Sequence, residues 1–161
     1  MEVTTPEHTG AASSEVATLY RREAPKLWRA VFAYAQDREV ANDAVAEAFA
    51  QYIRRGSGVR APRAWVWRAA FRIAAGELQR RGAIDEVPPD LAVPEPESDR
   101  VMPALGSLTP RQRAVVVLRY YAGYKPSEIA VILGTSAPTV RVHLMRARRR
   151  LAELLEETDE A

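Results

Sequence analysis

Hydrophobic residues recur every three or four positions through the first half of the chain, the spacing that places them on one face of an α-helix. Polar or glycine-rich breaks at Asp37 and at residues 56–58 divide this half into three segments. Pro25 lies inside the first segment and predicts a bend or a break there, because proline removes a backbone hydrogen bond. The positions expected to face inward are Val16, Leu19, Tyr20, Leu27, Trp28, Val31, Phe32, Ala35, Ala41, Val45, Ala48, Phe49, Tyr52, Trp67, Ala70, Phe71, Ala74 and Leu78.

The second half shows the same spacing over three shorter segments. The sequence TPRQ at 109–112 is a capping box that begins a helix running to Gly123. A short helix from Pro126 ends at Gly134, and Ser136 caps a longer helix that follows. A short helix, a three-residue turn with glycine and a longer helix predict a helix-turn-helix. The last helix has the apolar positions Val140, Leu144, Ala147 and Leu151.

The two halves are separated by residues 82–104, which contain five prolines, no sustained periodicity and an excess of acidic residues. Proline at this density prevents a helix and favours a flexible, extended linker. Residues 15–81 hold 13 Lys and Arg against 7 Asp and Glu, and residues 105–151 hold 9 against 1. We therefore predict an all-α protein with two small helical domains at 15–81 and 105–154, an acidic linker at 82–104, a disordered N-terminal tail at 1–14 and an acidic tail at 155–161.

The composition removes several classes of function. The chain has no cysteine, which excludes disulfides and thiolate metal sites. Its first residues have no apolar core of a signal peptide, and no apolar stretch is long enough to span a bilayer. A cytoplasmic location without membrane insertion is therefore expected. Because the sequence shows no phosphate-binding loop, metal-ligand cluster or histidine-based triad, neither an enzyme nor a cofactor is expected.

Residues 134–151 combine a helix cap with five arginines and no acidic residue. An ordinary solvated helix face mixes both signs, so this excess favours a polyanionic partner such as DNA. In a helix-turn-helix the second helix lies in the major groove, and its first residues face the base edges. His143 has no second ligand four residues away, so it is expected to face solvent or DNA rather than to bind a metal.

Two features of the first domain have more than one interpretation. Asp43 and Glu47 form an acidic pair one helical turn apart on an otherwise basic domain, either as solvated carboxylates or as a docking surface for a basic partner. Trp65 heads a basic stripe that continues through Arg68 and Arg72, and it could belong to the core or contact nucleic acid. The residue pattern by itself leaves both pairs of alternatives open.

The chain resembles bacterial sigma-70 factors in two regions, in the order found in that family. Residues 19–55 and 61–81, with the motif RAW at 63–65, are similar to the conserved second region. Residues 105–151 are similar to the fourth region through the motifs TPRQR, VLRY, EIA, LG, TVR and RAR. Because it combines these two regions with a short linker, the chain is similar to the small extracytoplasmic-function (ECF) group.

The resemblance implies a non-catalytic subunit that binds core RNA polymerase and directs promoter recognition, DNA melting and transcription initiation at the nucleoid. Asp43, Glu47 and Phe49 match the polymerase-facing motif. The loop 56–61 and the helix after it match the part that captures unpaired bases of the −10 element. Cations and aromatic faces suit single-stranded DNA, and they are supplied here by Arg60, Arg63, Trp65, Arg68 and Arg72. The residues that match readers of the −35 element are Ser136, Thr139, Arg141, Val142, Met145 and Arg146, with Arg149 suited to phosphate contacts.

Several positions depart from the usual residues of the family. Ala46 replaces Gln, Arg72 replaces Asn, Gly76 replaces Asp, and Val142 and His143 replace a Ser-Arg pair. These departures bear on which −10 and −35 sequences are read, and Ala46 also removes a polar contact to polymerase. An anti-sigma factor is a further partner that the family admits.

The main alternative is a stand-alone helix-turn-helix regulator whose first domain dimerises or senses a ligand. That alternative predicts tight binding of a symmetric dimer to duplex DNA. An adaptor that binds polymerase without DNA would leave the arginines of residues 134–151 without a role.

Overall fold

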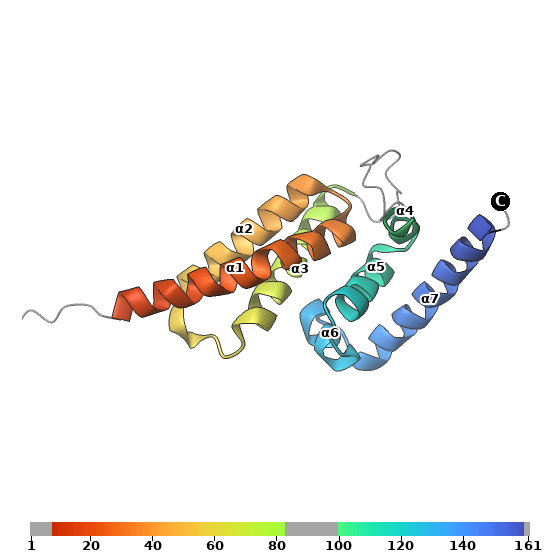
Figure 1. Ribbon diagram of the computed structural model, residues 1–161. Helices are drawn as coiled ribbons and strands as arrows, with labels where there is room; N and C mark the ends of the chain where they lie inside the picture. The colour runs from red at the N-terminus through yellow and green to blue at the C-terminus, as the bar shows by residue number, and fades with distance from the viewer. Residues whose placement is uncertain (1–7, 83–99, 160–161) are drawn as a thin grey trace, which may run out of the picture.

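The computed structural model describes residues 8–82 and 100–159, and the regular secondary structure in these ranges is helical (Figure 1). The predicted all-α fold is confirmed. In chain order the elements are α1 (His8–Ala35), α2 (Arg38–Arg55), the 3₁₀-helix η1 (Gly56–Gly58), α3 (Pro62–Arg80), α4 (Val101–Gly106), α5 (Pro110–Val116), the π-helix η2 (Val117–Tyr121), α6 (Pro126–Leu133) and α7 (Ala137–Asp159).

The first module, α1–α3, is a bundle in which each helix packs against the other two. Leu27 of α1 and Trp67 and Phe71 of α3 are among its largest fully buried side chains. Asp37 caps α2 as predicted, because its carboxylate accepts a hydrogen bond from the backbone N–H of Val40 at 2.9 Å. The inward stripes of the sequence therefore build one core.

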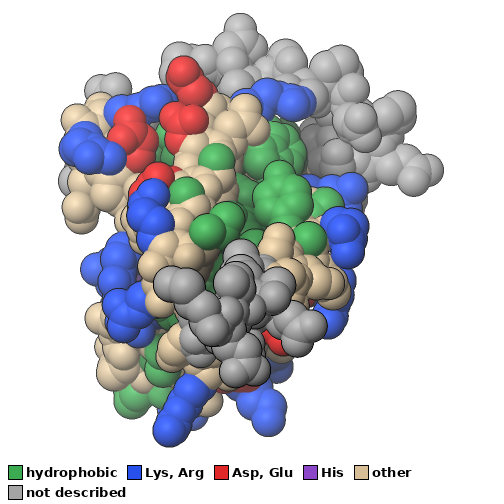
Figure 2. Space-filling model, turned by 90° about the vertical axis from the view of Figure 1, so that its left-hand side faces the viewer, with side chains coloured by type: hydrophobic (Ala, Val, Ile, Leu, Met, Phe, Trp, Pro, Cys, Tyr) green, Lys and Arg blue, Asp and Glu red, His purple; other side chains and the backbone are tan. Residues whose placement is uncertain are grey.

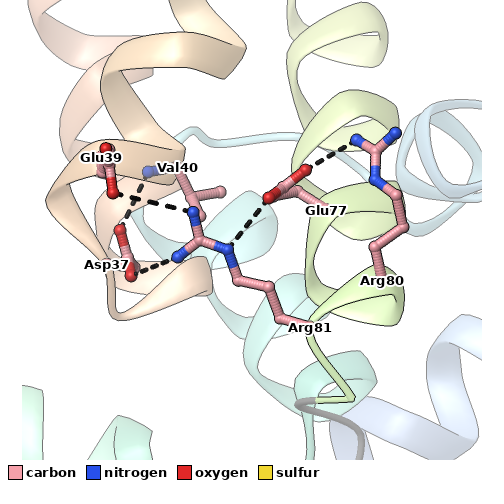
Figure 3. Close-up of polar contacts among 6 residues, drawn as sticks. All are labelled: Asp37, Glu39, Val40, Glu77, Arg80 and Arg81. Carbon is pink, nitrogen blue, oxygen red and sulfur yellow. Dashed lines mark hydrogen bonds and ion pairs between the residues drawn. The ribbon is translucent and has the colours of Figure 1, made fainter.

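Arg81 fastens the end of α3 to the start of α2 (Figure 3). Its guanidinium pairs with Asp37 at 2.9 Å and with Glu77 at 2.9 Å, and it approaches Glu39 at 3.8 Å. Glu77 also pairs with Arg80 at 2.7 Å. This network gives the last turn of α3 a fixed position against the α1–α2 turn.

α1 differs from the sequence prediction in three respects. It begins at His8, inside the segment expected to be disordered, and it continues through Pro25 without a break, which leaves a bend as the remaining expectation there. A single proline removes one intrahelical hydrogen bond, and the packing of α1 on both α2 and α3 outweighs that loss. Tyr20, expected to face inward, is 52% exposed, and its ring lies edge-on to Phe49 with 4.9 Å between the centroids.

The second module, α4–α7, begins earlier than predicted. α4 includes residues 101–104 of the expected linker, and Pro103 lies in its first turn, where a missing N–H removes no intrahelical bond. This helix therefore begins four residues before the expected boundary at 105. Residues 83–99, which make up most of the predicted linker, lie outside the described residues.

The second module contains the helices expected for a helix-turn-helix. The predicted capping box at the start of α5 is present, with Thr109 and Gln112 as its two members. α6 ends at Gly134, whose φ of 66° is in the left-handed region that glycine adopts readily. Ser136 caps α7 by accepting a hydrogen bond from the backbone N–H of Thr139 at 3.3 Å.

The helix predicted to run from Pro110 to Gly123 changes from an α-helix to a π-helix. α5 gives way at Val117 to a π-helix, in which the N–H of Ala122 bonds to the carbonyl of Val117 at 3.1 Å. The chain then turns at Gly123 and places Tyr124, which is 4% exposed, against the first module. Hydrophobic periodicity gave no indication of this wider turn.

The two modules pack against each other (Figure 1). α6 lies on α3, and α5 and η2 lie on α1. α7 packs on α5 and α6 at the side of the second module that is remote from the first module. The buried residues of both modules therefore form one continuous core.

Candidate nucleic-acid interface

The first half of α7 separates an apolar face from a polar one. Val140, Leu144 and Ala147 are buried against α5 and α6, as the sequence predicted. The other face is accessible, with Val142 and Met145 39% and 51% exposed. The residues predicted to read the −35 element are exposed or half-buried on α7 and its cap: Ser136, Thr139, Arg141, Val142, Met145, Arg146 and Arg149.

The arginines of α7 are not equivalent. Within the described part of the chain, Arg141, Arg146 and Arg149 form no ion pair. Arg148 donates a hydrogen bond to the Tyr120 hydroxyl, and its guanidinium lies 5.5 Å from the centre of that ring. Arg141, Arg146 and Arg149 therefore present uncompensated positive charge, whereas Arg148 is held against η2.

His143 is half-buried on the same helix. Burial, together with the positive charges of Arg111 and Arg146, lowers the pKa of His143 below its usual value. Its imidazole is therefore neutral near pH 7. No cluster of metal-binding side chains occurs among the residues that the structure describes.

The loop before α3 and the first turns of α3 line a cleft of about 370 Å³. Three predicted −10 residues meet here: Arg60, Trp65 and Arg68. Arg55 joins them from the end of α2, and the sequence analysis did not select it. The opposite wall is formed by Tyr124, Glu128, Val131 and Ile132 of the second module. The cleft therefore lies between the two modules.

The other two predicted −10 residues are in different surroundings. Arg72 is exposed further along α3 and does not line the cleft. Arg63 is held between the modules: its Nε donates to Glu23 at 3.2 Å, and its Nη2 donates to the carbonyl of Ala122 at 3.4 Å. Its guanidinium also stacks 4.8 Å from the centre of the Tyr124 ring. Arg63 therefore makes intramolecular contacts in this conformation.

Trp65 is half-buried and lies 5.9 Å from Tyr52, measured between ring centroids. It is therefore both packed against α2 and open to the cleft. The core interpretation of Trp65 therefore applies in part, and its contact with nucleic acid stays a prediction.

The acidic pair of α2 is accessible, but its neighbour Phe49 is not. Asp43 is exposed, and the carboxylate of Glu47 accepts hydrogen bonds from Gln51 at 3.0 Å and Arg54 at 2.8 Å. These two hydrogen bonds lower the pKa of Glu47. Phe49 is 3% exposed, because it belongs to the inward stripe of α2. Its assignment to polymerase binding stays a prediction, and in this structure its buried ring supports the helix from beneath.

The surface charge is unevenly distributed. In the view of Figure 2, Lys and Arg side chains surround the face, and the acidic side chains gather mainly at its upper left. This pattern agrees with the excess of basic residues counted in both helical halves. A long polyanion can therefore contact positive charge on more than one side of the molecule.

Comparisons with known proteins identify the class. The profile of the family "Sigma-70, region 4" matches residues 98–151. The ECF RNA polymerase sigma factor SigM of Mycobacterium tuberculosis is 32% identical over 149 residues, which cover 85% of this chain and 75% of SigM. SigL of the same species is 29% identical over 168 residues, covering 92% and 95%. The solved structure of CnrH in complex with the cytosolic domain of CnrY superposes with a TM-score of 0.69 and 25% identity, covering 92% of this chain and 94% of CnrH.

The helix-turn-helix, the basic surfaces and these likenesses define a bacterial transcription initiation subunit. The chain belongs to the sigma-70 family, in its ECF group. It is a sigma factor that binds core RNA polymerase and promoter DNA and directs transcription initiation. Sigma factors are generally non-enzymatic regulators, and the stand-alone regulator is not favoured. None of the described helices is both long enough and apolar enough to cross a membrane.

Proposed function

We propose a division of labour among three surfaces of this sigma factor. The exposed side of α2 docks on core polymerase, the cleft beside α3 captures the unpaired −10 strand, and the outer face of α7 reads the −35 element. The observation that carries this proposal is the outer face of α7, where three exposed arginines have no ion pair in the described structure. Uncompensated charge on a helix with an accessible, capped N-terminus suits the major groove.

On α7, the residues divide by position along the helix. Arg141 and Met145 lie one turn apart near the N-terminal end, which in a helix-turn-helix faces the bases. Val142 offers an apolar surface of the kind that contacts a thymine methyl group. Arg149 lies two turns further on, where a phosphate contact is expected. Ser136, Thr139 and Arg146 complete the proposed −35 surface.

For the −10 element, single-strand capture needs cations for the phosphates and aromatic rings for the bases. Arg60 and Arg68 supply the first and Trp65 the second within one cleft. We add Arg55, which lines the same cleft, to the set inferred from sequence. Arg72 extends the basic surface along α3, and Arg63 belongs to it once its contacts with the second module are released.

For polymerase, Asp43 and Glu47 provide two carboxylates on the exposed side of α2. The pKa of Glu47 is lowered, so it stays ionised at neutral pH. Ala46 lies exposed between them, so this chain docks without the polar side chain that is usual there.

The remaining assignments follow from this role. The domains are those predicted from sequence, with the second starting at α4, and the chain acts as a recognition subunit rather than an enzyme. Its site of action is the cytoplasm, at the nucleoid, where polymerase and promoters are found. CnrH was solved in complex with the cytosolic domain of CnrY, and the sigma factor RpoE from Bartonella quintana was solved in complex with the anti-sigma factor NepR. We propose an anti-sigma factor as a partner of this chain also.

The test is run-off transcription from pooled genomic fragments with purified core polymerase, with and without the chain. We expect specific transcripts only when the chain is present, and their promoters should share two upstream elements. Reversing Asp43 and Glu47 together to Lys should weaken co-purification with polymerase while helical content stays unchanged. Equal recovery of this double variant would contradict the α2 assignment. A free chain that protects a palindromic duplex at nanomolar concentration would contradict the whole proposal.

A further inference from the structure

The cleft beside α3 has the size of a small-molecule site. Its volume of about 370 Å³ lies within the range of roughly 300–1,000 Å³ that such sites have in proteins. Side chains from the end of α2, the loop before α3, α3 itself and α6 line it. A strand of several nucleotides needs a longer groove, so in this arrangement the cleft has room for one small molecule.

The two walls of the cleft are held in position by hydrogen bonds between the modules. Arg63 of α3 donates to the carbonyl of Ala122, which directly follows η2, at 3.4 Å. Arg113 of α5 donates to the carbonyl of Tyr34 in the last turn of α1. A cavity whose walls are already in place requires little ordering when a ligand enters. The cleft is therefore largely preformed, as small-molecule sites usually are.

The cleft carries positive charge that the protein does not neutralise. Arg55, Arg60 and Arg68 line it, and within the described residues none of the three forms an ion pair or a side-chain hydrogen bond. By contrast Arg54, the neighbour of Arg55, pairs with Glu47 at 2.8 Å. Guanidinium groups bind phosphate oxygens through pairs of parallel hydrogen bonds. The three arginines therefore favour a ligand that carries several negative charges on phosphate groups.

The cleft also offers an aromatic surface. Trp65 is half-buried and packs against Tyr52 of α2, with 5.9 Å between the ring centroids. The indole N–H groups of Trp28 and Trp67 donate to side chains of the protein, whereas that of Trp65 has no hydrogen-bond partner among the described residues. Val131, which is 61% exposed, lines the opposite wall. A flat ring in the cleft would therefore stack on Trp65 and cover the apolar side chain of Val131.

Glu128 of α6 is the one carboxylate among the described residues that line the cleft. Its Oε1 accepts a hydrogen bond from the backbone N–H of Lys125 at 3.0 Å, which leaves acceptor capacity on the other oxygen. A carboxylate repels a ligand that is anionic throughout, but it accepts a hydrogen bond from a neutral amino group. Glu128 therefore favours a ligand that combines phosphate groups with such a donor.

Tyr124 adds an unsatisfied polar group at the same wall. It lines the cleft, and its hydroxyl is buried and has no hydrogen-bond partner in the described structure. Burial raises the pKa of Tyr124 to about 12, so the phenol is protonated at neutral pH and can donate. A buried donor without an acceptor is unfavourable in the free protein. A ligand oxygen that reaches this hydroxyl would remove that penalty.

We propose that this cleft is a binding site for a free purine nucleotide that has at least two phosphate groups and an amino group on its base. The phosphates bind the three arginines, the base stacks on Trp65, and its amino group donates to Glu128. Arg60, Trp65 and Arg68 also belong to the surface proposed for the −10 strand. A bound nucleotide therefore excludes that strand, and this consequence, unlike the site itself, rests on the proposed function.

The site can be tested by calorimetric titration of the full chain with ADP, inosine diphosphate and inorganic pyrophosphate. The two nucleotides differ at position 6 of the base, where inosine has a carbonyl oxygen in place of the amino group. We expect one ADP per chain, bound about tenfold more tightly than inosine diphosphate or pyrophosphate. Pyrophosphate binding as tightly as ADP, or no saturable binding of ADP, would overturn the nucleotide site. Glu128→Gln should remove the preference for ADP over inosine diphosphate, and an unchanged preference would overturn the role of Glu128.

Arg55→Ala tests the phosphate contacts, and Arg54→Ala is its matched control. Both residues are exposed neighbours at the end of α2, and each change removes one positive charge, but only Arg55 lines the cleft. We expect Arg55→Ala to weaken ADP binding about tenfold and Arg54→Ala to change it little. Equal losses in the two variants would show attraction by net charge alone and overturn the site.

Tryptophan fluorescence locates the base. Stacking of a purine on an indole quenches its emission, so ADP should quench the chain, and Trp65→Phe should remove most of that quenching. Trp28→Phe is the control, because Trp28 does not line the cleft and its N–H is bonded to Asn42. Circular dichroism confirms that both variants are folded. Quenching that persists in folded Trp65→Phe would overturn the placement of the base.

Competition separates the nucleotide site from the −10 assignment. A short fluorescent single-stranded oligonucleotide of mixed sequence is bound to the full chain, and ADP is then added. We expect ADP to displace the oligonucleotide, and Arg55→Ala to need about tenfold more ADP for the same displacement. If ADP binds but the oligonucleotide stays bound, the −10 assignment fails and the nucleotide site stands. If the oligonucleotide binds and ADP does not, the nucleotide site is overturned and the −10 assignment stands.

Discussion

Two arginine-rich surfaces of this sigma factor are organised in different ways. On α7, Arg141, Arg146 and Arg149 are exposed and form no ion pair within the described residues. Beside α3, Arg63 is surrounded by Glu23, Trp67 and Tyr124. If both surfaces bind DNA as proposed, the first can do so as it stands, whereas Arg63 on the second must first lose its internal contacts. The two surfaces therefore differ in the ion pairing and burial of their arginines rather than in the number of arginines.

The largest change in the free energy of unfolding is expected when the surface beside α3 loses the buried carboxylate of Glu23. Glu23→Ala leaves Arg63 and the Trp67 indole without their shared acceptor. Fully buried pairs lose about 3–5 kcal/mol when one partner is removed, and since Arg63 is 40% exposed we expect about 2–3 kcal/mol. Urea unfolding would measure this loss. The matched control is Glu47→Ala, because the exposed pair of Glu47 with Arg54 should contribute nothing measurable to stability. Equal losses of stability in both variants would contradict the stronger role of the Glu23 pair.

On the open surface, Arg141→Ala should change which promoters are read. A good bidentate contact with a base contributes roughly 1–3 kcal/mol of discrimination, so we expect about tenfold or greater loss of preference at one upstream position. Transcription from a library of randomised −35 elements, in the polymerase complex, would reveal it. A preference unchanged at every position would exclude Arg141 as a base reader.

Arg149→Ala should act alike on all sequences, because a phosphate contact carries no base information. Loss of one such contact should reduce the slope of log affinity against log salt by about 0.9. Arg148→Ala is the comparison, since the Tyr120 hydroxyl and ring already engage Arg148. We expect its salt slope to change less than that of Arg149→Ala. The reverse order would show that the contact with Tyr120 does not persist on DNA.

The smallest effect concerns the hydroxyl of Tyr124, which is buried and has no hydrogen-bond partner in the described structure. Tyr124→Phe removes this unsatisfied group and should stabilise the fold by up to about 1 kcal/mol. Burial raises the pKa of Tyr124 to about 12, above the usual value near 10. The native state therefore favours the protonated phenol, and its stability should fall as the pH rises from about 10 to 12. In Tyr124→Phe this alkaline loss should be smaller, and an identical pH profile would contradict the assignment.

The helices and their caps could be predicted from sequence because they depend on neighbours within a few residues. Asp37, Ser136 and the Thr109–Gln112 box cap the helices that follow them, and Gly134 ends α6. The outer face of α7 follows from periodicity in the same way. Local chemistry determines each of these features, so they needed no knowledge of the rest of the fold.

The relation between the modules could not be predicted, because it depends on residues far apart in the chain. Arg63 and Ala122 are separated by 59 positions, and Arg113 and Tyr34 by 79. Periodicity assigns a residue to a face of its own helix but does not say what covers that face. Phe49 shows that two kinds of sequence inference can disagree. Periodicity placed Phe49 on the inward face of α2, whereas the family motif assigned it to polymerase binding.

The π-helix η2 sets the angular phase of the second module. Arg113 and Ala122 are nine residues apart, which in an uninterrupted α-helix is about 2.5 turns and would place them on opposite sides. The longer repeat of the π-helix reduces this rotation, and both positions meet the first module. Removing one residue from 117–121 would leave a helical segment of good apolar composition but rotate all that follows by roughly 100°. The one extra residue in this turn therefore determines how the segment after it is rotated about the helix axis relative to the first module.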